Sequence, residues 1–254
     1  NKLISRFTDD HFVILTSLPA LKKQIPVITG QIHGLYDASN LDVKFGICPV
    51  DEYTMPVEVG CSRARMACDC IKEIPDRHVC YYTHAMGEKR NLRNYIIDHF
   101  REALEKRWIH VYFQPVIRTI SGTLASVEAL SRWIDPQKGM ISPGIFVPLL
   151  EDSRQIRKLD MYVLEEICRL CQLQREQGKV MIPVSFNLSR MDFFQGSVFE
   201  EVEEIRKRYQ VPRNMLYVEI TESVLIHEGD VLYQEIERFR QAGYEVWMDD
   251  FGSG

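Results

Sequence analysis

Three short apolar segments decide the fold class of this chain: MIPVSFN at 181–187, LYVEI at 216–220 and EVWMD at 245–249. Each has the length and the content of β-branched and aromatic residues that are typical of a buried strand. Amphipathic segments at 198–209 and 231–241 separate them, and we expect a helix over each. Strand and helix units that repeat about every thirty residues predict a parallel sheet that is covered by helices.

The same pattern extends towards the N-terminus. The apolar segments 111–114 and 124–130 are joined by a short polar turn and predict a hairpin. Helices are expected over 143–150 and 155–177, because apolar residues recur there at helical spacing. We therefore predict an α/β fold, a TIM-like (β/α) barrel over 108–254 with about five of its strands in this chain. An open, doubly wound sheet is the alternative that this pattern also allows.

The first third of the chain has a different order of elements. It predicts an α+β segment over residues 1–84. Residues 85–107 are polar with one apolar stripe, which is typical of a helix that links two domains. The domain limits that we expect are therefore 1–84, 85–107 and 108–254. The elements expected in the first segment are strands at 11–16, 42–49 and 78–83 and a helix at 57–72.

The composition argues against several classes of function. The 254 residues are 45% hydrophobic and 26% charged, as in globular proteins, and the net charge of −5 offers no basic surface for a DNA or RNA duplex. No apolar run approaches the roughly 18 residues that span a membrane. The seven cysteines are an odd number without the spacing of a zinc site, so we expect reduced thiols and a cytoplasmic location.

Oxygen-bearing side chains stand at the ends of the expected strands. In a β/α barrel these strand ends meet at one face, so residues far apart in sequence are expected to surround one point. Carboxylate and amide oxygens, without histidine or thiolate, are typical ligands of Mg²⁺ or Mn²⁺. An adjacent pair of aspartates suits two neighbouring ions, an arrangement that activates water against a phosphoryl centre. The residues are Glu128, Asn187, Glu219, Asp249 and Asp250.

Each of these residues, taken alone, also has a purely structural explanation. Asn187 and Ser189 fit the cap of a following helix, and Asp250 fits the start of a turn. Arg132 fits a solvated charge at the end of a strand. The presence of five oxygen donors at consecutive strand ends favours the metal site over these separate explanations.

Several ordered motifs match a known family. The segment EALSR at 128–132, preceded by FQP at 113–115, resembles the signature of EAL domains, the phosphodiesterases of the bacterial second messenger cyclic di-GMP (c-di-GMP). Further matching segments occur in the order of the family, over roughly 95–254. They are FVPLLE at 146–151, LD at 159–160, NLS at 187–189, EITES at 219–223 and DDFG at 249–252.

The resemblance implies an activity and a set of site residues. The implied reaction is the metal-dependent hydrolysis of one phosphodiester bond of c-di-GMP, which gives linear pGpG, at a site with two Mg²⁺ or Mn²⁺ ions. Arg132 would contact a substrate phosphate, Gln114 would lie on the nucleotide, and Glu222 would anchor the loop after the fifth strand. The implied ligands are Glu128, Asn187, Glu219 and Asp249 for the first ion and Asp250 for the second; Glu128, Asp249, Asp250 and Glu222 are implied to be required for catalysis.

The first segment resembles the second half of a GGDEF domain, the diguanylate cyclase that is often fused before an EAL domain. The resemblance is carried by RFTDDHF at 6–12 and by FGI at 45–47. Thr8 and Asp9 occupy the two glycine positions of the signature, and His11 occupies its second acidic position. Side chains would intrude where the nucleotide approaches the backbone, and histidine is a poor replacement for a carboxylate on Mg²⁺. We therefore expect no cyclase activity.

The EAL family places a lysine, further carboxylates and a glutamine on its last three barrel strands. No such sequence follows Gly254, so we expect this chain to be an excerpt of a longer protein, with an incomplete barrel. An open edge strand invites pairing with a second copy, and a homodimer is one expected state. The alternative function is a catalytically inactive module that binds c-di-GMP or acts as a scaffold.

Overall fold

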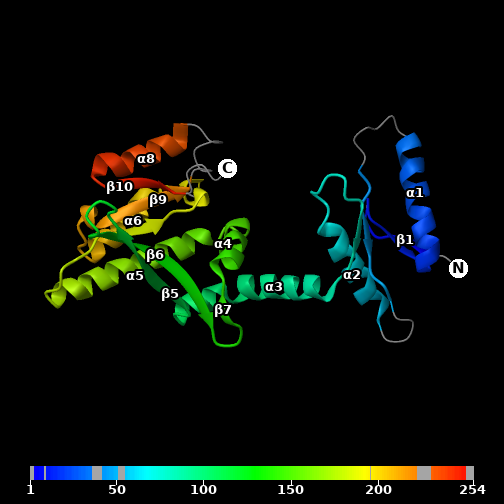
Figure 1. The fold of residues 1–254 in the computed structure, drawn as a ribbon, viewed down its shortest axis with the longest axis horizontal. Helices are drawn as coiled ribbons and strands as arrows, with labels where there is room; N and C mark the ends of the chain where they lie inside the picture. The colour runs from blue at the N-terminus through cyan, green and yellow to red at the C-terminus, as the bar shows by residue number, and fades with distance from the viewer. Residues whose placement is uncertain are drawn as a thin grey trace. The chain divides into compact units, whose positions relative to one another are not determined.

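The protein is described here by a computed structural model that covers residues 3–8, 10–35, 42–50, 55–194, 196–221 and 230–249. The chain divides into two compact units, Asn1–Leu92 and Arg93–Gly254, and helix α3 (His84–Glu105) contains the point of division (Figure 1). The domain limits expected from the sequence stay predictions. Among the described residues, no helix has both the length and the hydropathy of a membrane span.

The first unit contains two small sheets. In one, β1 pairs antiparallel with β2; in the other, β3 pairs parallel with β4. Helix α2 packs on β3 at Gly46, where a Cβ atom would lie 1.9 Å from the carbonyl oxygen of Ala64, so only glycine fits there. The bounds are β1 Leu3–Arg6, β2 Phe12–Leu15, α1 Leu18–Leu35, β3 Phe45–Ile47, α2 Val57–Asp69 and β4 Val79–Tyr81.

The strands and the helix that the sequence predicts for this unit are present as β2, β3, β4 and α2. Strand β1 and helix α1 were not predicted. Helix α1 contains Pro26 in its interior, where proline removes a backbone hydrogen bond and normally ends a helix. Pro26 is therefore a sequence signal against a helix at this place, and α1 forms in spite of it.

The second unit is built on a sheet with the strand order β10-β9-β8-β6-β5, and β7 pairs with the far end of β6. Strands β6, β8, β9 and β10 are parallel, and β5 forms the predicted antiparallel hairpin with β6. The order follows the chain without the reversal of a doubly wound sheet. The bounds are β5 Ile109–Ile117, β6 Leu124–Asp135, β7 Gly139–Ile141, β8 Val184–Asn187, β9 Leu216–Thr221 and β10 Glu245–Asp249. Among the described strands, β5 and β10 are the two edges of an open sheet.

Helices lie against one face of this sheet (Figure 1). That face is apolar because alternate strand residues such as Val184, Phe186 and Val218 point to it, and all three are buried. Helix α5 contacts β5, β6 and β8, and α8 contacts β10. The bounds are α4 Pro143–Asp152, α5 Ile156–Glu176, α6 Val198–Arg208 and α8 Asp230–Ala242, with the short 3₁₀ helices η1 Arg190–Phe194 and η2 Arg213–Met215. The mixed α/β content that the sequence predicts is confirmed.

The second half of α3 belongs to this core. Ile96, Phe100 and Ala103 are fully buried. The Phe100 ring lies 6.2 Å from the Trp133 ring, which in turn meets the Phe146 ring edge-on at 5.8 Å. These aromatic contacts join α3, β6 and α4 and place the EAL segment of β6 firmly against the helices.

Candidate metal and phosphodiester site

The strand register brings three of the predicted metal ligands to the same face of the sheet. Glu128 pairs with Ser185 across β6 and β8, and Asn187 pairs with Glu219 across β8 and β9. Residues paired in a parallel ladder point the same way, and Asn187 lies two residues beyond Ser185. The side chains of Glu128, Asn187 and Glu219 therefore project from the face opposite to the apolar, helix-covered one.

The remaining acidic residues of the predicted site are described less fully. The backbone of Asp249 pairs with Thr221 at the ends of β10 and β9. The side chain of Asp249 and the whole of Asp250 and Glu222 lie outside the described residues. Their expected roles as ligands or catalytic groups stay predictions.

The two residues expected to contact the substrate lie on the same face as Glu128. Gln114 pairs with Glu128 across the β5–β6 hairpin, and Arg132 pairs with His110. Gln114 is exposed and Arg132 is half-buried. Since Arg132 lies four residues beyond Glu128, its Cα is roughly 13 Å further along the strand. Arg132 is thus distant from Glu128 along the strand, and its expected contact with a substrate phosphate stays a prediction.

The environment of these oxygen donors suits a hard cation. Glu219 is buried, at 7% exposure, and Glu128 and Asn187 are half-buried. Carboxylates gathered on one partly buried face repel one another, and a divalent cation relieves that repulsion. Within the described residues no three His, Cys, Asp or Glu side chains gather closely enough to hold a metal ion. The donor set expected for Mg²⁺ or Mn²⁺ also includes the amide of Asn187, Asp249 at the end of β10 and Asp250 after it, and it stays a prediction.

The loop that leaves β8 is held by a group of residues that the motifs did not single out for a role. The backbone N–H of Ser189 donates to both Asp160 on α5 and Asp192 on η1, at 3.1 and 2.8 Å. The hydroxyl of Ser189 donates to Glu151 at 2.8 Å. The signal in the sequence was a carboxylate, Asp160, inside the apolar stripe of the predicted helix at 155–177.

The residues expected to replace the GGDEF signature lie at the β1–β2 connection, and the resemblance itself stays a prediction. The hydroxyl of Thr8 and Nδ1 of His11 are 2.9 Å apart, and the N–H of Phe7 donates to the carbonyl of His11 at 2.8 Å. Asp9 lies outside the described residues. A hydrogen-bonded side-chain pair, Thr8 with His11, thus stands on this turn.

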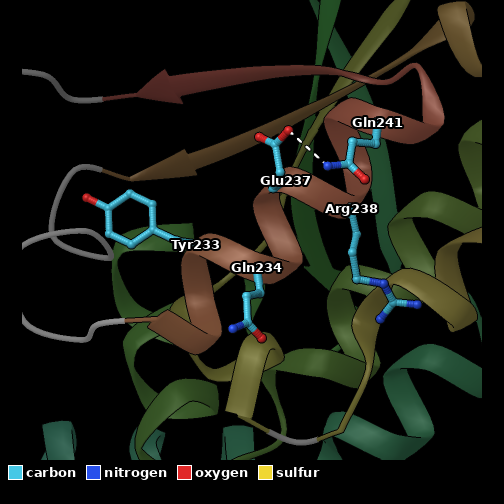
Figure 2. A pocket seen from close by; sticks show the side chains of 5 residues that line it. All are labelled: Tyr233, Gln234, Glu237, Arg238 and Gln241. Carbon is cyan, nitrogen blue, oxygen red and sulfur yellow. Dashed lines mark hydrogen bonds between the residues drawn. The ribbon is translucent and has the colours of Figure 1, made fainter.

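One surface hollow in the described part of the chain lies elsewhere. It measures about 560 Å³ and is lined by side chains of α8 alone (Figure 2). Gln241 donates to Glu237 at 3.2 Å, and Arg238 pairs with Glu235 and Glu200. These side chains form hydrogen bonds and ion pairs with their neighbours on the outer surface of α8. They lie away from the face of the sheet that carries Glu128. We therefore assign the site by register and chemistry and not by this hollow.

A smaller cavity, about 290 Å³, lies between α5 and the sheet. Its lining is almost wholly apolar and includes Phe113, Ile167 and Val184. Val184 belongs to the helix-covered face, so this cavity is separated by the sheet from the face of Glu128 and Asn187. Among the residues that the structure describes, its lining includes Gln174 but no cationic side chain that could pair with a phosphate.

The architecture and the site define an α/β domain in which consecutive parallel strands carry oxygen donors on one open face: Asn187 ends β8, whereas Glu128 and Glu219 lie within β6 and β9 and not at the predicted strand ends. The model of the EAL domain matches residues 97–254. The chain belongs to the EAL domain family. That match agrees with the motifs that the sequence alone presents, from EALSR at 128–132 onwards.

Characterised relatives share this domain. The chain is similar to the bifunctional diguanylate cyclase/cyclic di-GMP phosphodiesterase MucR of Pseudomonas aeruginosa. The two are 30% identical over 175 residues, and this match covers 69% of this chain and 26% of MucR. It is 26% identical to the cyclic di-GMP phosphodiesterase PdeR of Escherichia coli, over 100% of this chain and 39% of PdeR. A solved structure of the MucR phosphodiesterase in complex with c-di-GMP is similar at a TM-score of 0.59, with 32% identity over 63% of this chain and 65% of that one. The chain thus spans only part of the length of these relatives.

Proposed function

We propose that this chain is the phosphodiesterase module of a signalling protein and hydrolyses c-di-GMP to linear pGpG. The observation that carries the proposal is the strand register, which places Glu128, Asn187 and Glu219 on one face in a chain of the EAL family. Two relatives that match here are named cyclic di-GMP phosphodiesterases, and the MucR structure holds c-di-GMP. The substrate is therefore carried over from relatives of the same domain.

The residues of the donor face suggest how the reaction is supported. Glu128, Asn187 and Glu219, with Asp249 and Asp250, would hold two Mg²⁺ or Mn²⁺ ions, which supply charge neutralisation at the phosphate and an acidified water. Arg132 would pair with a phosphate oxygen through its planar guanidinium. Gln114, exposed on the edge hairpin, would contact the nucleotide, and Glu222 would anchor the loop after β9.

The wider organisation of the protein is also part of the proposal. The unreversed order β6-β8-β9-β10 supports a TIM-like barrel as the complete domain. The motifs at 6–12 and 45–47 support a degenerate GGDEF-like segment before it, and the match to PdeR extends through these residues. A cytoplasmic location and a homodimer stay predictions.

The test is an assay of the full-length protein with c-di-GMP and either Mg²⁺ or Mn²⁺, in which the appearance of pGpG is followed. We expect turnover that a chelator abolishes, because the site has only hard oxygen donors. Glu128→Gln is expected to lower turnover by roughly a hundredfold or more, since it removes a charged ligand. Glu237→Gln, an exposed carboxylate on α8, serves as the matched control and should keep full activity.

Three outcomes would overturn the proposal or its metal assignment. Turnover in an excess of chelator, or full activity of Glu128→Gln, would show that the metal assignment is wrong. Tight binding of c-di-GMP without pGpG under all metal conditions would identify the protein as a receptor for the nucleotide instead of a hydrolase.

A further inference from the structure

Two buried carboxyl groups meet beside the loop that follows β8. Asp160 on α5 is 8% exposed and Asp192 on η1 is fully buried. Both accept a hydrogen bond from the same donor, the backbone N–H of Ser189, at 3.1 Å to Oδ2 of Asp160 and 2.8 Å to Oδ2 of Asp192. One amide thus joins two acidic side chains that are 32 residues apart in sequence.

The chemistry of this pair requires a proton. Oδ1 of Asp192 is buried and has no nitrogen or hydroxyl donor within hydrogen-bond distance among the described residues. Two ionised carboxylates that are both buried and accept from the same amide would be strongly unfavourable. A proton on Asp160 would relieve this repulsion and provide a donor towards Asp192. Burial, followed by the neighbouring Asp192, raises the pKa of Asp160 well above its ordinary range, which agrees with this arrangement.

The same loop is held from two further sides. The hydroxyl of Ser189 donates to Glu151 at the end of α4, at 2.8 Å. Arg157, one turn before Asp160 on α5, donates to the carbonyl of Asp192 at 3.0 Å and to that of Ser197 at 3.2 Å. The first turn of α5 therefore fixes both the beginning and the end of the segment that contains η1.

This segment begins directly after Asn187. The N–H of Leu188 donates to the carbonyl of Glu219 at 2.9 Å, and the next N–H, that of Ser189, is the one held by the two carboxyl groups. The first two peptide groups after Asn187 are thus bonded, one to β9 and one to α5 and η1. The backbone direction at Asn187, and with it the placement of its amide, depends on these two bonds.

We propose that Asp160 and Asp192 are positioning residues: joined by one shared proton, they hold the amide of Ser189 and thereby set Asn187 relative to Glu219. This inference rests on the proposed function, because it takes Asn187 as a metal ligand. The pair itself does not touch the metal or the substrate.

The test compares Asp160→Ala with Asp160→Asn in the full-length protein. Asparagine has the shape of the protonated acid, so its carbonyl can accept from Ser189 while its NH₂ donates to Asp192. Alanine removes both bonds. We expect Asp160→Ala to speed hydrogen exchange of the amides at 188–192 about tenfold in metal-free protein, and Asp160→Asn to restore slow exchange.

Metal binding and turnover provide the second readout. Asp160→Ala should weaken Mn²⁺ binding in titration calorimetry about tenfold and lower kcat for c-di-GMP by a similar factor, with little change in KM, and Asp160→Asn should recover most of both. Glu203→Gln is the matched control, because it also alters a buried carboxylate of the same unit but lies in another network. It should leave exchange at 188–192 unchanged.

The outcomes separate this inference from the proposed function. Unchanged exchange at 188–192 in Asp160→Ala would overturn the positioning role, as would equal damage in the alanine and asparagine variants. A wild-type protein that forms no pGpG would overturn the proposed function, while loop exchange and Mn²⁺ binding would still decide whether the pair positions Asn187.

Discussion

The buried pair of Asp160 and Asp192 makes the stability of the protein depend on pH in a direction that can be stated. The folded protein keeps a proton on Asp160, whose pKa is raised by burial and then by Asp192, whereas the unfolded chain loses it near the ordinary value of an aspartate. Glu151 also raises this pKa, and Arg157 and Glu201 act on Asp192 in opposite directions. Between the two pKa values the folded state binds more protons than the unfolded state, so raising the pH costs stability.

We therefore expect the free energy of unfolding to fall as the pH rises above about 4, by at most about 1.4 kcal/mol per pH unit for this proton, until the raised pKa is passed. Asp160→Asn has no such proton and should show a flatter curve at neutral and alkaline pH. Urea unfolding of both proteins between pH 5 and pH 9 measures this difference. Parallel curves for the two proteins would show that Asp160 carries no extra proton in the folded state.

Among individual residues, the sequence identifies some members of the site and misses others, for a physical reason. Glu128, Asn187 and Glu219 are found because each stands at or next to a short apolar segment, and such segments are visible as a pattern along the chain, although the structure places Glu128 and Glu219 within their strands. Asp160 and Asp192 act through a contact between a helix and a distant 3₁₀ helix, and no periodicity along the chain records such a contact. The sequence offered one sign of this contact, namely that the carboxylate of Asp160 lies on the apolar stripe of the predicted helix at 155–177.

Among the elements, α6 is tied to its neighbours by one acidic side chain. Glu203, 5% exposed, accepts hydrogen bonds from Arg206, from Arg213 on η2 and from the hydroxyl of Tyr244, the last at 2.6 Å. The hydrogen bonds from Arg213, supported by those from Arg206 and Tyr244, hold the pKa of Glu203 well below its usual range. The network joins α6 to η2 and to the turn between α8 and β10.

Removal of this carboxylate should destabilise the domain. We expect Glu203→Ala to lower the free energy of unfolding by about 3 kcal/mol at pH 7, because it leaves cationic groups in a partly buried place without their partner. Glu204→Ala is the matched control, since Glu204 is exposed and pairs only at the surface with Arg208, and it should cost less than about 1 kcal/mol. Chemical denaturation of the three proteins measures both effects.

The acid dependence gives a second check on Glu203. Its pKa is lowered in the folded state, so its contribution is present above the ordinary pKa of a glutamate and is lost as the pH falls towards the lowered value. The difference in stability between wild type and Glu203→Ala should therefore shrink on acidification below about pH 4. A difference that stays constant down to pH 2 would contradict a charged role for this residue.

The helices and strands were predictable wherever apolar residues recur with one clear spacing, that of a helix or that of a strand. Strand β7 was not predicted, but the other strands and the α-helices from β5 to β10 lie close to their predicted ranges because apolar residues recur at strand or helix spacing. Strand β8 begins at Val184, later than the predicted start at Met181, and Pro183 directly before it has no N–H to contribute to the ladder. Helix α1 was missed because Pro26 and Gly30 obscure its pattern. Local signals fail where tertiary context overrides them.

For the whole molecule, the two faces of the sheet have different functions. The helix-covered face supplies the apolar core, and the other carries the oxygen donors in a protein whose net charge is already −5. An anionic substrate such as a cyclic dinucleotide gains nothing from that overall charge. Under the proposed function, recognition of its phosphates would therefore come from local cations, namely Arg132 and the proposed metal ions. The strand order made this arrangement predictable, whereas the exact register became known only from the structure.

The last prediction concerns the first unit: the protein should not make c-di-GMP from GTP. In the GGDEF signature, glycines let the nucleotide approach the backbone, but here the Thr8 side chain stands on the β1–β2 connection and lies 2.9 Å from the ring nitrogen of His11. If the predicted GGDEF alignment holds, His11 in place of the acidic residue would also remove a hard oxygen ligand for the metal on the triphosphate. Both requirements for the cyclase reaction would then be missing at the same turn.

The assay has to account for the proposed hydrolase, which would destroy any c-di-GMP that formed. We would therefore incubate the Glu128→Gln variant of the full-length protein with GTP and Mg²⁺ or Mn²⁺, and follow c-di-GMP and pGpG together. An active diguanylate cyclase added to the same mixture is the positive control, because its product should accumulate beside the variant. Either nucleotide above the level of a protein-free control would contradict the prediction. It would mean that Thr8 and His11 leave enough room and enough metal affinity for two GTP molecules to react.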